Sequence, residues 1–300
     1  MVSVIKRKIN GKEYYSLQYS YRENGDMRNL YKEIGKKIPE NIEDIKEEFI
    51  EEIVNKRWSQ FIEETKNRFK SKLDKLPKSR QLEHFKNFGI RFTYHTNKIE
   101  GSTLTLREVD LAVNEPNIPI NKSTNDIVEA KLHWDIYNEF TENIDDFELS
   151  RELTLEWHGK LFSMHPNRNN FAGMIRKDQI YISGSNYVPP SGGIVCEELL
   201  DDLFEWYNEK EFTMHPLLLA CLMHFRYVSI HPFLDGNGRL SRLVMNYILY
   251  KNNYPMFDIP YSIRKSYYNA LERANLKEDD MIFVGWFFRN YLKYAEDLKM

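Results

Sequence analysis

The sequence predicts a mainly α-helical protein that begins with a small antiparallel β-sheet, and three observations support this prediction. After residue 39, apolar side chains recur at three- and four-residue steps, which is the pattern of helices with one buried face. Residues 1–39 show instead the two-residue alternation of strands. The 300 residues are 42% hydrophobic and include 19 Tyr and 18 Phe, so the chain can bury a sizeable core.

Charge and cysteine usage exclude several classes of protein. The 42 Lys and Arg residues nearly balance the 45 Asp and Glu residues, which excludes a short basic nucleic-acid module and an acidic disordered chain. Cys196 and Cys221 have no metal-binding or redox spacing, so we expect two buried free thiols. The chain opens without a signal-peptide pattern, and the apolar run 217–230 is shorter than the roughly 20 residues that span a bilayer. We therefore expect a cytoplasmic protein without a membrane segment.

Residues 1–39 are predicted to form a three-stranded antiparallel β-meander. The Asn-Gly pairs at 10–11 and 24–25 readily supply the positive φ angles of tight hairpin turns. Between these pairs, aromatic or aliphatic side chains occupy every second position from Tyr15 to Tyr21. The meander contains 9 Lys and Arg against 4 acidic residues, which gives it a local charge of +5.

From residue 40 the apolar period becomes that of helices. A long amphipathic helix is predicted over 40–76, with its aromatic stripe in the core or in a dimer seam, and Pro77 ends it. A second helix over about 79–100 stops at Gly101, and residues 105–108 form the pattern of a capping box. We expect further helices at 124–141, 151–164, 192–209, 215–230, 239–251, 262–275 and 279–297.

One segment, 172–190, interrupts the helical pattern. Its apolar run, its glycine and the Pro-Pro pair at 189–190 predict an extended strand or β-hairpin followed by a rigid turn. The chain is therefore expected to divide into a meander at 1–39, a connecting helix at 40–77 and a helical domain at 78–300.

The densest group of chemically active residues is 231–242, with the sequence His-Pro-Phe-Leu-Asp-Gly-Asn-Gly-Arg-Leu-Ser-Arg. The residues 236–238 tolerate unusual backbone angles, so their N–H groups and the positive end of the following helix can bind an anion. Arg239 and Arg242 lie three residues apart in the first turn of that helix and suit the outer phosphates of a polyphosphate. The segment therefore predicts a phosphate site.

Two further residues of this segment suit phosphate chemistry. Asp235 is a hard oxygen donor beside the phosphate site, where Mg²⁺ is usually held by one carboxylate and substrate oxygens. His231 can be neutral near pH 7 and accept a proton. A Gly-Asn-Gly turn or a single histidine before proline can be purely structural, but here all these features fall within twelve residues.

This segment resembles the signature of the Fic family, His-Pro-Phe-x-(Asp/Glu)-Gly-Asn-Gly-Arg-x-x-Arg, at every fixed position. The resemblance implies a Fic-type helical bundle with a β-hairpin flap, and Mg²⁺-dependent transfer of AMP from ATP to a Ser, Thr or Tyr hydroxyl of a target protein. His231 would be the catalytic base and Asp235 the Mg²⁺ ligand. The resemblance implies these nucleotide-binding residues: Asp235, Gly236, Asn237, Gly238, Arg239, Leu240, Ser241 and Arg242.

A second segment, Thr-Asn-Lys-Ile-Glu-Gly at 96–101, resembles the inhibitory motif of the family, (Ser/Thr)-x-x-x-Glu-(Gly/Asn). The resemblance implies that Glu100 occupies the γ-phosphate position by pairing with Arg242, and it places the chain in the class with an amino-terminal inhibitory helix. Thr96 and Glu100 are four residues apart and share one helix face, so the hydroxyl can steady the turn. A glutamate that ends a helix can also be simply solvated. We expect a Glu100–Arg242 pair that restrains the enzyme.

Two other regions resemble parts of the same fold, and the resemblance runs from about 79 to 297. The segment 172–190 is similar to the flap that holds the target by backbone pairing. Tyr268 and Asn275 resemble adenine-side residues and share a helix face, although a tyrosine packed in the core fits that position equally well. The flap residues expected to bind the target are Ile180, Tyr181, Ile182, Ser183, Gly184 and Ser185.

Three functions stay open at this point. The first is an adenylyltransferase restrained by Glu100, with ATP and a target protein as partners and with self-modification or a homodimer allowed. The second is hydrolytic removal of the same AMP group, with Glu100 aligning a water and His231 returning a proton. The third and weakest is a non-enzymatic ATP-sensing regulator that binds nucleic acid through the basic meander. A metal site of His215, His224 and His231 is disfavoured, because His215 is expected to begin a helix, the gap from His224 to His231 crosses a helix end, and no acidic or Cys ligand spacing supports it.

Overall fold

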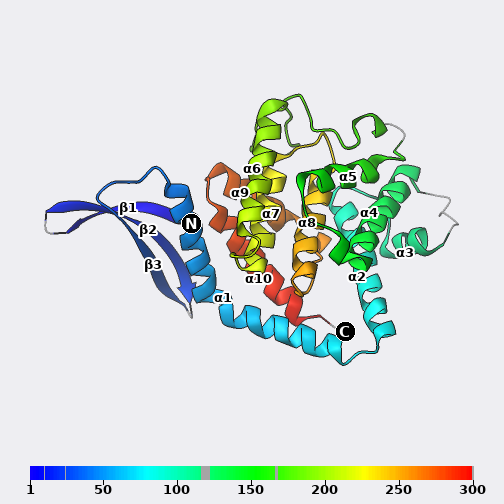
Figure 1. The fold of residues 1–300 in the computed structure, drawn as a ribbon, viewed down its shortest axis with the longest axis horizontal. Coiled ribbons are helices and arrows are strands. Elements are labelled where there is room, and N and C mark those ends of the chain that lie inside the picture. Colours follow the sequence, from blue (N-terminus) through cyan, green and yellow to red (C-terminus); the bar gives the residue numbers. More distant parts are fainter. Residues whose placement is uncertain (10, 24, 116–121, 166–167, 299–300) are drawn as a thin grey trace.

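The computed structural model describes residues 1–9, 11–23, 25–115, 122–165 and 168–298. It is mainly helical, with a small sheet projecting from one end of the helical body and a long helix running beneath that body (Figure 1). The predicted fold class is confirmed. No helix in these ranges is long and apolar enough to cross a bilayer.

The sheet is the predicted antiparallel meander, in the order β1-β2-β3. Its strands are β1 (Val2–Ile9), β2 (Lys12–Glu23) and β3 (Asp26–Gly35). Gly11 and Gly25 have φ values of 75° and 89° at the two turns, as the Asn-Gly pairs predict. One face of β2 is buried against the long helix, where the Arg57 guanidinium donates to the Tyr19 hydroxyl at 2.5 Å and lies 4.4 Å from the centre of the Tyr21 ring.

The helices lie close to their predicted positions. Their bounds are α1 (Ile42–Asp74), α2 (Lys78–Ile99), α3 (Leu106–Asn114), α4 (Thr124–Glu142), α5 (Arg151–Phe162), α6 (Ile194–Lys210), α7 (Pro216–Ile230), α8 (Asn237–Lys251), α9 (Arg264–Leu276) and α10 (Asp280–Glu296). The capping box of α3 is present, because the Thr105 hydroxyl and the Glu108 carboxylate each accept a bond from the other residue's backbone N–H. Helix α8 begins two residues earlier than predicted, directly after Gly236, whose φ is 81°.

The buried centre of the bundle is the hairpin of α7 and α8 (Figure 1). Both helices are buried on nearly all sides, so their connecting loop is fixed at one end of the core. His215 begins α7, where its Nδ1 accepts the Leu217 N–H at 3.2 Å. Cys196 and Cys221 are buried and free, which confirms the prediction for the thiols.

The aromatic stripe of α1 packs into the same core. Trp58 stacks on Phe288 of α10 with the ring centres 4.8 Å apart. One hydrophobic cluster extends from Leu17 of the sheet through α1 to the central hairpin. The division of the chain at residues 39 and 77 stays a prediction.

The predicted β-hairpin between 172 and 190 does not form, since no residue of this segment is in a strand. Pro189 and Pro190 lack the N–H groups that a β-ladder needs on that arm. Side chains bridge the two arms instead: Gln179 donates to the Pro189 carbonyl at 2.9 Å, and Arg176 donates to the Pro190 carbonyl at 2.6 Å. We call residues 172–190 the flap segment.

Truncating the buried tryptophan of α1 should destabilise the whole chain. We expect Trp58→Ala to lower the free energy of unfolding by about 3–5 kcal/mol, because it opens a cavity against α10. Phe61→Ala on the same helix is the control, because Phe61 is 51% exposed and should cost less than about 0.5 kcal/mol. Urea unfolding followed by tryptophan fluorescence and circular dichroism measures both. Equal losses in the two variants would contradict this packing.

Candidate active site

The loop 231–236 between α7 and α8 carries the first half of the predicted motif. His231 ends α7 in the left-handed conformation, with φ 55° and ψ 59°. The Asn237 side chain closes the loop, because its Oδ1 accepts the Phe233 N–H at 2.9 Å and its Nδ2 donates to the Phe233 carbonyl at 2.8 Å. Both polar atoms of the Asn237 side chain are therefore engaged within the loop. An anion at Asn237 would be bound by backbone N–H groups.

The imidazole of His231 is prepared to accept a proton. Its Nδ1 lies 3.2 Å from the Val228 carbonyl, and because a carbonyl can only accept, Nδ1 carries the hydrogen of the neutral ring. This leaves Nε2 as the proton acceptor. Burial lowers the pKa of His231 below its ordinary value, so the ring is neutral at pH 7.

A buried arginine that we did not predict holds the loop and the flap segment together. Arg176 donates to the carbonyls of His231 at 2.7 Å, Asp178 at 2.8 Å and Pro190 at 2.6 Å. Its backbone N–H also donates to the Pro232 carbonyl at 2.9 Å. No local sequence pattern indicates this role, because the His231 carbonyl lies 55 residues away in the sequence.

His158 of α5 supports the loop from the other side. Its ring stacks on Phe233 at 3.8 Å between ring centres and 5° between planes. Nδ1 accepts the Gly173 N–H at 2.7 Å, so Nε2 carries the hydrogen and donates to the Asp235 carbonyl at 3.2 Å. Burial lowers the pKa of His158 to about 4, which keeps the ring neutral and this arrangement intact.

A pocket of about 760 Å³ opens above the loop, between the flap segment, α9 and the end of α2. Several predicted side chains line it: His231, Asp235, Gly238, Arg242, Glu100, Tyr268, Asn275 and the flap residues Ile180, Tyr181, Ile182, Ser183, Gly184 and Ser185. Other predicted residues do not line it: Gly236, Asn237, Arg239, Leu240, Ser241 and Thr96. The structure thus brings the proposed base, one motif arginine and the flap to one cavity.

Arg242 and Glu100 form the predicted ion pair at the pocket wall, 2.5 Å apart. Arg242 also donates from Nε to the Thr96 hydroxyl at 2.7 Å. Thr96 therefore helps to hold the guanidinium in place. The Arg242 side chain is only 1% exposed, whereas that of Glu100 is 30% exposed. A Cβ atom on Gly238 would force the Glu100 carboxylate to shift, so the pair fits closely against this glycine.

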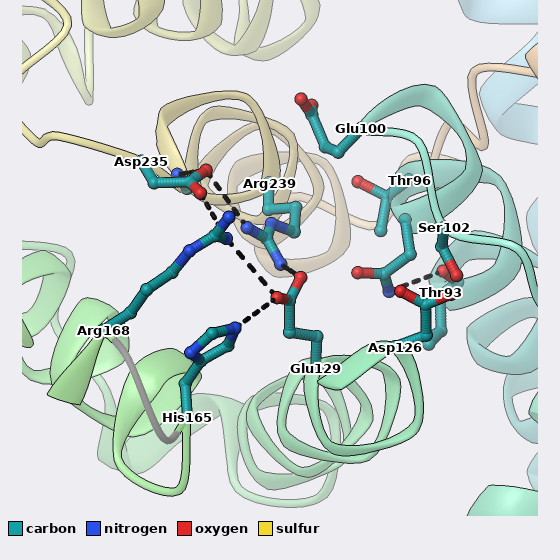
Figure 2. A network of polar contacts seen from close by, with 12 residues as sticks. Thr93, Thr96, Glu100, Ser102, Asp126, Glu129, His165, Arg168, Asp235 and Arg239 are labelled. Carbon is teal, nitrogen blue, oxygen red and sulfur yellow. Dashed lines mark hydrogen bonds and ion pairs between the residues drawn. The ribbon is translucent and has the colours of Figure 1, made fainter. Parts of the chain in front are cut away.

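Arg239 does not line the pocket, and its expected role with phosphates stays a prediction. Its guanidinium pairs with Glu129 of α4 and lies 3.3 Å from Asp235 (Figure 2). The neighbouring Leu240 and Ser241 are also buried, and the Ser241 hydroxyl donates to the Gly238 carbonyl at 2.9 Å. These side chains therefore stabilise the helix start, while Arg242 alone among them faces the pocket.

Asp235 fits a metal that arrives with phosphates. Its carboxylate lines the pocket, but no group of three or more His, Cys, Asp or Glu side chains within the described ranges could hold a metal by itself. Mg²⁺ typically takes one or two carboxylates and completes its shell with phosphate oxygens and water. A single aspartate beside an anion site meets that requirement.

Helix α9 forms the wall of the pocket that carries the predicted adenine-side residues. Tyr268 is 43% exposed and donates to the Ile99 carbonyl at 3.2 Å, whereas Tyr267 is fully buried and lies 3.0 Å from the His224 Nε2. Both tyrosines line the pocket, and Tyr268, which was predicted, is the more exposed of the two. Glu272, which we did not predict, accepts the Asn186 N–H at 2.6 Å and so joins α9 to the flap segment.

Comparisons with known proteins agree with this fold and site. Residues 148–249 match the model of the Fic/DOC family. The protein adenylyltransferases Fic of Drosophila ananassae and Drosophila melanogaster are 35% and 34% identical over 187 residues. These matches cover 61% of this chain but only 36% of either relative, so the chain spans about a third of their length.

Two solved structures have a similar fold. Fic-1 (residues 134–508) of Caenorhabditis elegans has a TM-score of 0.69 at 23% identity, and the match covers 82% of this chain and 71% of that one. A Fic domain containing signalling protein of Bacteroides thetaiotaomicron has a TM-score of 0.70 at 24% identity, covering 79% and 94% of the two chains. The chain therefore shares its fold with these proteins, and the loop lies within the residues that match the Fic/DOC family model.

His158 should make the free energy of unfolding decrease as the pH falls. Because its pKa is about 4 in the folded protein and about 6.5 in the unfolded chain, only the unfolded chain takes up this proton as the pH falls between those values. This stabilisation is fully present above about pH 6.5 and declines by up to about 3 kcal/mol near pH 4. We expect His158→Gln to show a smaller decline over this range in urea titrations. An unchanged pH slope would contradict the assignment, whatever the overall stability of the variant.

Proposed function

We propose that this chain is a protein adenylyltransferase that transfers AMP from ATP to a hydroxyl side chain of a target protein. The observation that carries the proposal is a single pocket lined by a neutral histidine, a buried arginine and the glutamate paired with that arginine. The relatives named protein adenylyltransferase Fic support this activity. The proposal places the chain in the class with an amino-terminal inhibitory helix, α2.

Arg242 would bind the outer phosphates of ATP. Its guanidinium is buried, and its charged partner in the described part of the chain is a carboxylate at the pocket wall, so a phosphate can replace that carboxylate. Gly238 presents no side chain, which lets a phosphate approach the backbone at the start of α8. Tyr268 and Asn275 would contact the base at the other end of the pocket.

The reaction would use His231 as the base. Nε2 takes the proton of the target hydroxyl while the hydroxyl oxygen attacks the α-phosphorus of ATP, and the bond from that phosphorus to the pyrophosphate oxygen breaks. The products are an AMP ester on the target and pyrophosphate. Mg²⁺ would neutralise the phosphate charge when bound, and Asp235 would hold it.

The flap segment would position the target. Tyr181 at its tip is 77% exposed, and the residues Ile180–Ser185 border the pocket beside His231. An extended target segment that pairs with backbone groups here would bring its hydroxyl to the imidazole without much side-chain selection. Arg176 fixes both arms of the flap segment to the loop, and Glu272 fixes Asn186 of the flap segment to α9.

Glu100 would restrain this activity. Its carboxylate occupies the position beside Arg242 that the γ-phosphate needs, so inhibitor and substrate compete for one cation. The turn at Gly101, with φ 102°, ends α2 and sets the direction in which Glu100 projects. Self-modification and a homodimer remain part of the proposal.

Removal of AMP from a modified target is a second candidate, because Glu100 and His231 line the same pocket and could align a water and return a proton. The nucleic-acid hypothesis gains no such support. Lys6 and Lys32 of the basic meander are paired with carboxylates, Lys6 with Glu13 at 2.6 Å and Lys32 with acidic residues of α1.

Labelling with α-phosphate-labelled ATP and Mg²⁺ tests the proposal. We expect Glu100→Gly to increase incorporation into the protein itself or a lysate partner at least about tenfold, because the phosphate site is freed, and His231→Ala to abolish it. Glu142→Gly is the matched control, since Glu142 is exposed at the end of α4 and should leave labelling unchanged.

Two results would decide against transfer. Equal labelling by the His231→Ala protein would show that the histidine is not the base. If Glu100→Gly shows no gain in labelling but loses the release of AMP from a pre-modified target, the chain is a hydrolase of the same bond.

The pH dependence should report the lowered pKa of His231. A base acts only when unprotonated, so the labelling rate of Glu100→Gly at saturating ATP should stay level from pH 8 down to about 6.5 and fall below it. Initial rates across this range measure the midpoint. A midpoint above about 6.5 would assign the titration to another group.

A further inference from the structure

Five charged or titratable side chains gather beside the pocket and are not explained by phosphate binding. They are Glu129 of α4, His165 after α5, Arg168 before the short helix at Asn169–Phe171, Asp235 of the loop and Arg239 of α8 (Figure 2). Glu129 lies at the centre and pairs with His165 at 3.3 Å, with Arg168 at 3.4 Å and with Arg239. The cluster therefore connects Asp235, the proposed metal ligand, to three other elements.

The two oxygens of Asp235 have different partners. Oδ1 accepts the N–H of Gly236 at 2.5 Å and lies 3.3 Å from Arg239, so it belongs to the structure of the loop. Oδ2 pairs with the guanidinium of Arg168. Oδ2 is thus the oxygen with which Asp235 can coordinate a metal. In this structure the guanidinium of Arg168 is already paired with it.

The two arginines at Asp235 differ in how firmly they are held. The Arg239 side chain is 1% exposed, and withdrawing it would leave Glu129 beside a buried vacancy. The Arg168 side chain is 37% exposed and has a second carboxylate, Glu129, at 3.4 Å. Arg168 can therefore leave Asp235 without losing its charge partner or creating a buried unpaired group.

We propose that Arg168 is a built-in counterion that competes with Mg²⁺ for Asp235, and that its guanidinium must move toward Glu129 before the metal binds. The inference rests on the proposed role of Asp235 as the metal ligand. Both cations need the Oδ2 lone pairs, and two cations at a few ångströms repel each other, so occupancy is exclusive. This restraint acts on the metal, whereas Glu100 acts on the γ-phosphate position, so the two are separate.

The prediction concerns binding of Mn²⁺ in the presence of ADP at a concentration equal to that of the protein, because the phosphates complete the metal shell beside Asp235. It is measured by the electron paramagnetic resonance signal of the free ion. Arg168→Gln removes the charge and keeps the length and polarity, so Mn²⁺ should bind about tenfold more tightly than to the unaltered chain. Arg168→Lys keeps a cation and should stay within about threefold of the unaltered chain. Arg151→Gln is the matched control, because Arg151 of α5 pairs with Asp201 of α6 at 2.9 Å. Its substitution should leave the Mn²⁺ affinity unchanged.

Asp235→Asn combined with Arg168→Gln locates the site, since the gain in Mn²⁺ affinity should disappear. Unchanged affinity in Arg168→Gln, together with loss of Mn²⁺ binding in Asp235→Asn alone, would overturn the competition but leave the metal ligand intact. Mn²⁺ binding that survives Asp235→Asn would overturn the proposed metal ligand itself. Thermal unfolding in the absence of metal confirms that each variant is folded.

Discussion

The candidate site depends on one constraint, which is that the loop 231–236 reverses the chain between two helices that are buried on nearly every side. Neither helix can shift without disturbing the core, so the loop has a fixed span to cross. The left-handed His231 makes the first bend, and the Asn237 amide closes the loop from within. Arg176 and His158 then fasten the flap segment to this loop through buried hydrogen bonds. The positions of His231, of the start of α8 and of the flap segment are therefore set by the packing of one helical hairpin.

The first turn of α8 separates two arginines into different environments. Arg239 and Arg242 are both 1% exposed, yet Arg239 faces Glu129 in the interior, and Arg242 faces Glu100 at the pocket wall. A spacing of three residues turns the side chains by about 300°, so neighbouring elements decide which partner each one meets. The Glu129 carboxylate thus supplies the counter-charge of Arg239 within the protein. Arg242 is the cation that an incoming anion can reach.

Much of this arrangement follows from local sequence rules. The period of apolar residues predicts the helices, and the Asn-Gly pairs predict the hairpin turns. The residues 105–108 predict the capping box. These predictions succeed because each of these structures is formed by residues a few positions apart. The flap segment was mispredicted as a hairpin because the prediction relied on its apolar run. Pro189 and Pro190 lack the N–H groups that would form β-ladder hydrogen bonds. The contacts of Arg176, Glu129 and the loop after α5 were missed for another reason. They join segments that are tens of residues apart, and only the packing of the helices brings these segments together.

In the proposed function, restraint by Glu100 and binding of the nucleotide are linked through the cost of burying a charge. A buried guanidinium without a counter-charge is unfavourable by several kcal/mol, so Arg242 requires an anion in every state of the site. Glu100 meets this requirement from a side chain that is 30% exposed and located at the end of a helix, where it can swing outward with little loss of packing. A triphosphate can meet it equally well. The two anions would repel each other at one guanidinium, so under the proposed function each would exclude the other, and the position of the last turn of α2 would decide whether a nucleotide can bind.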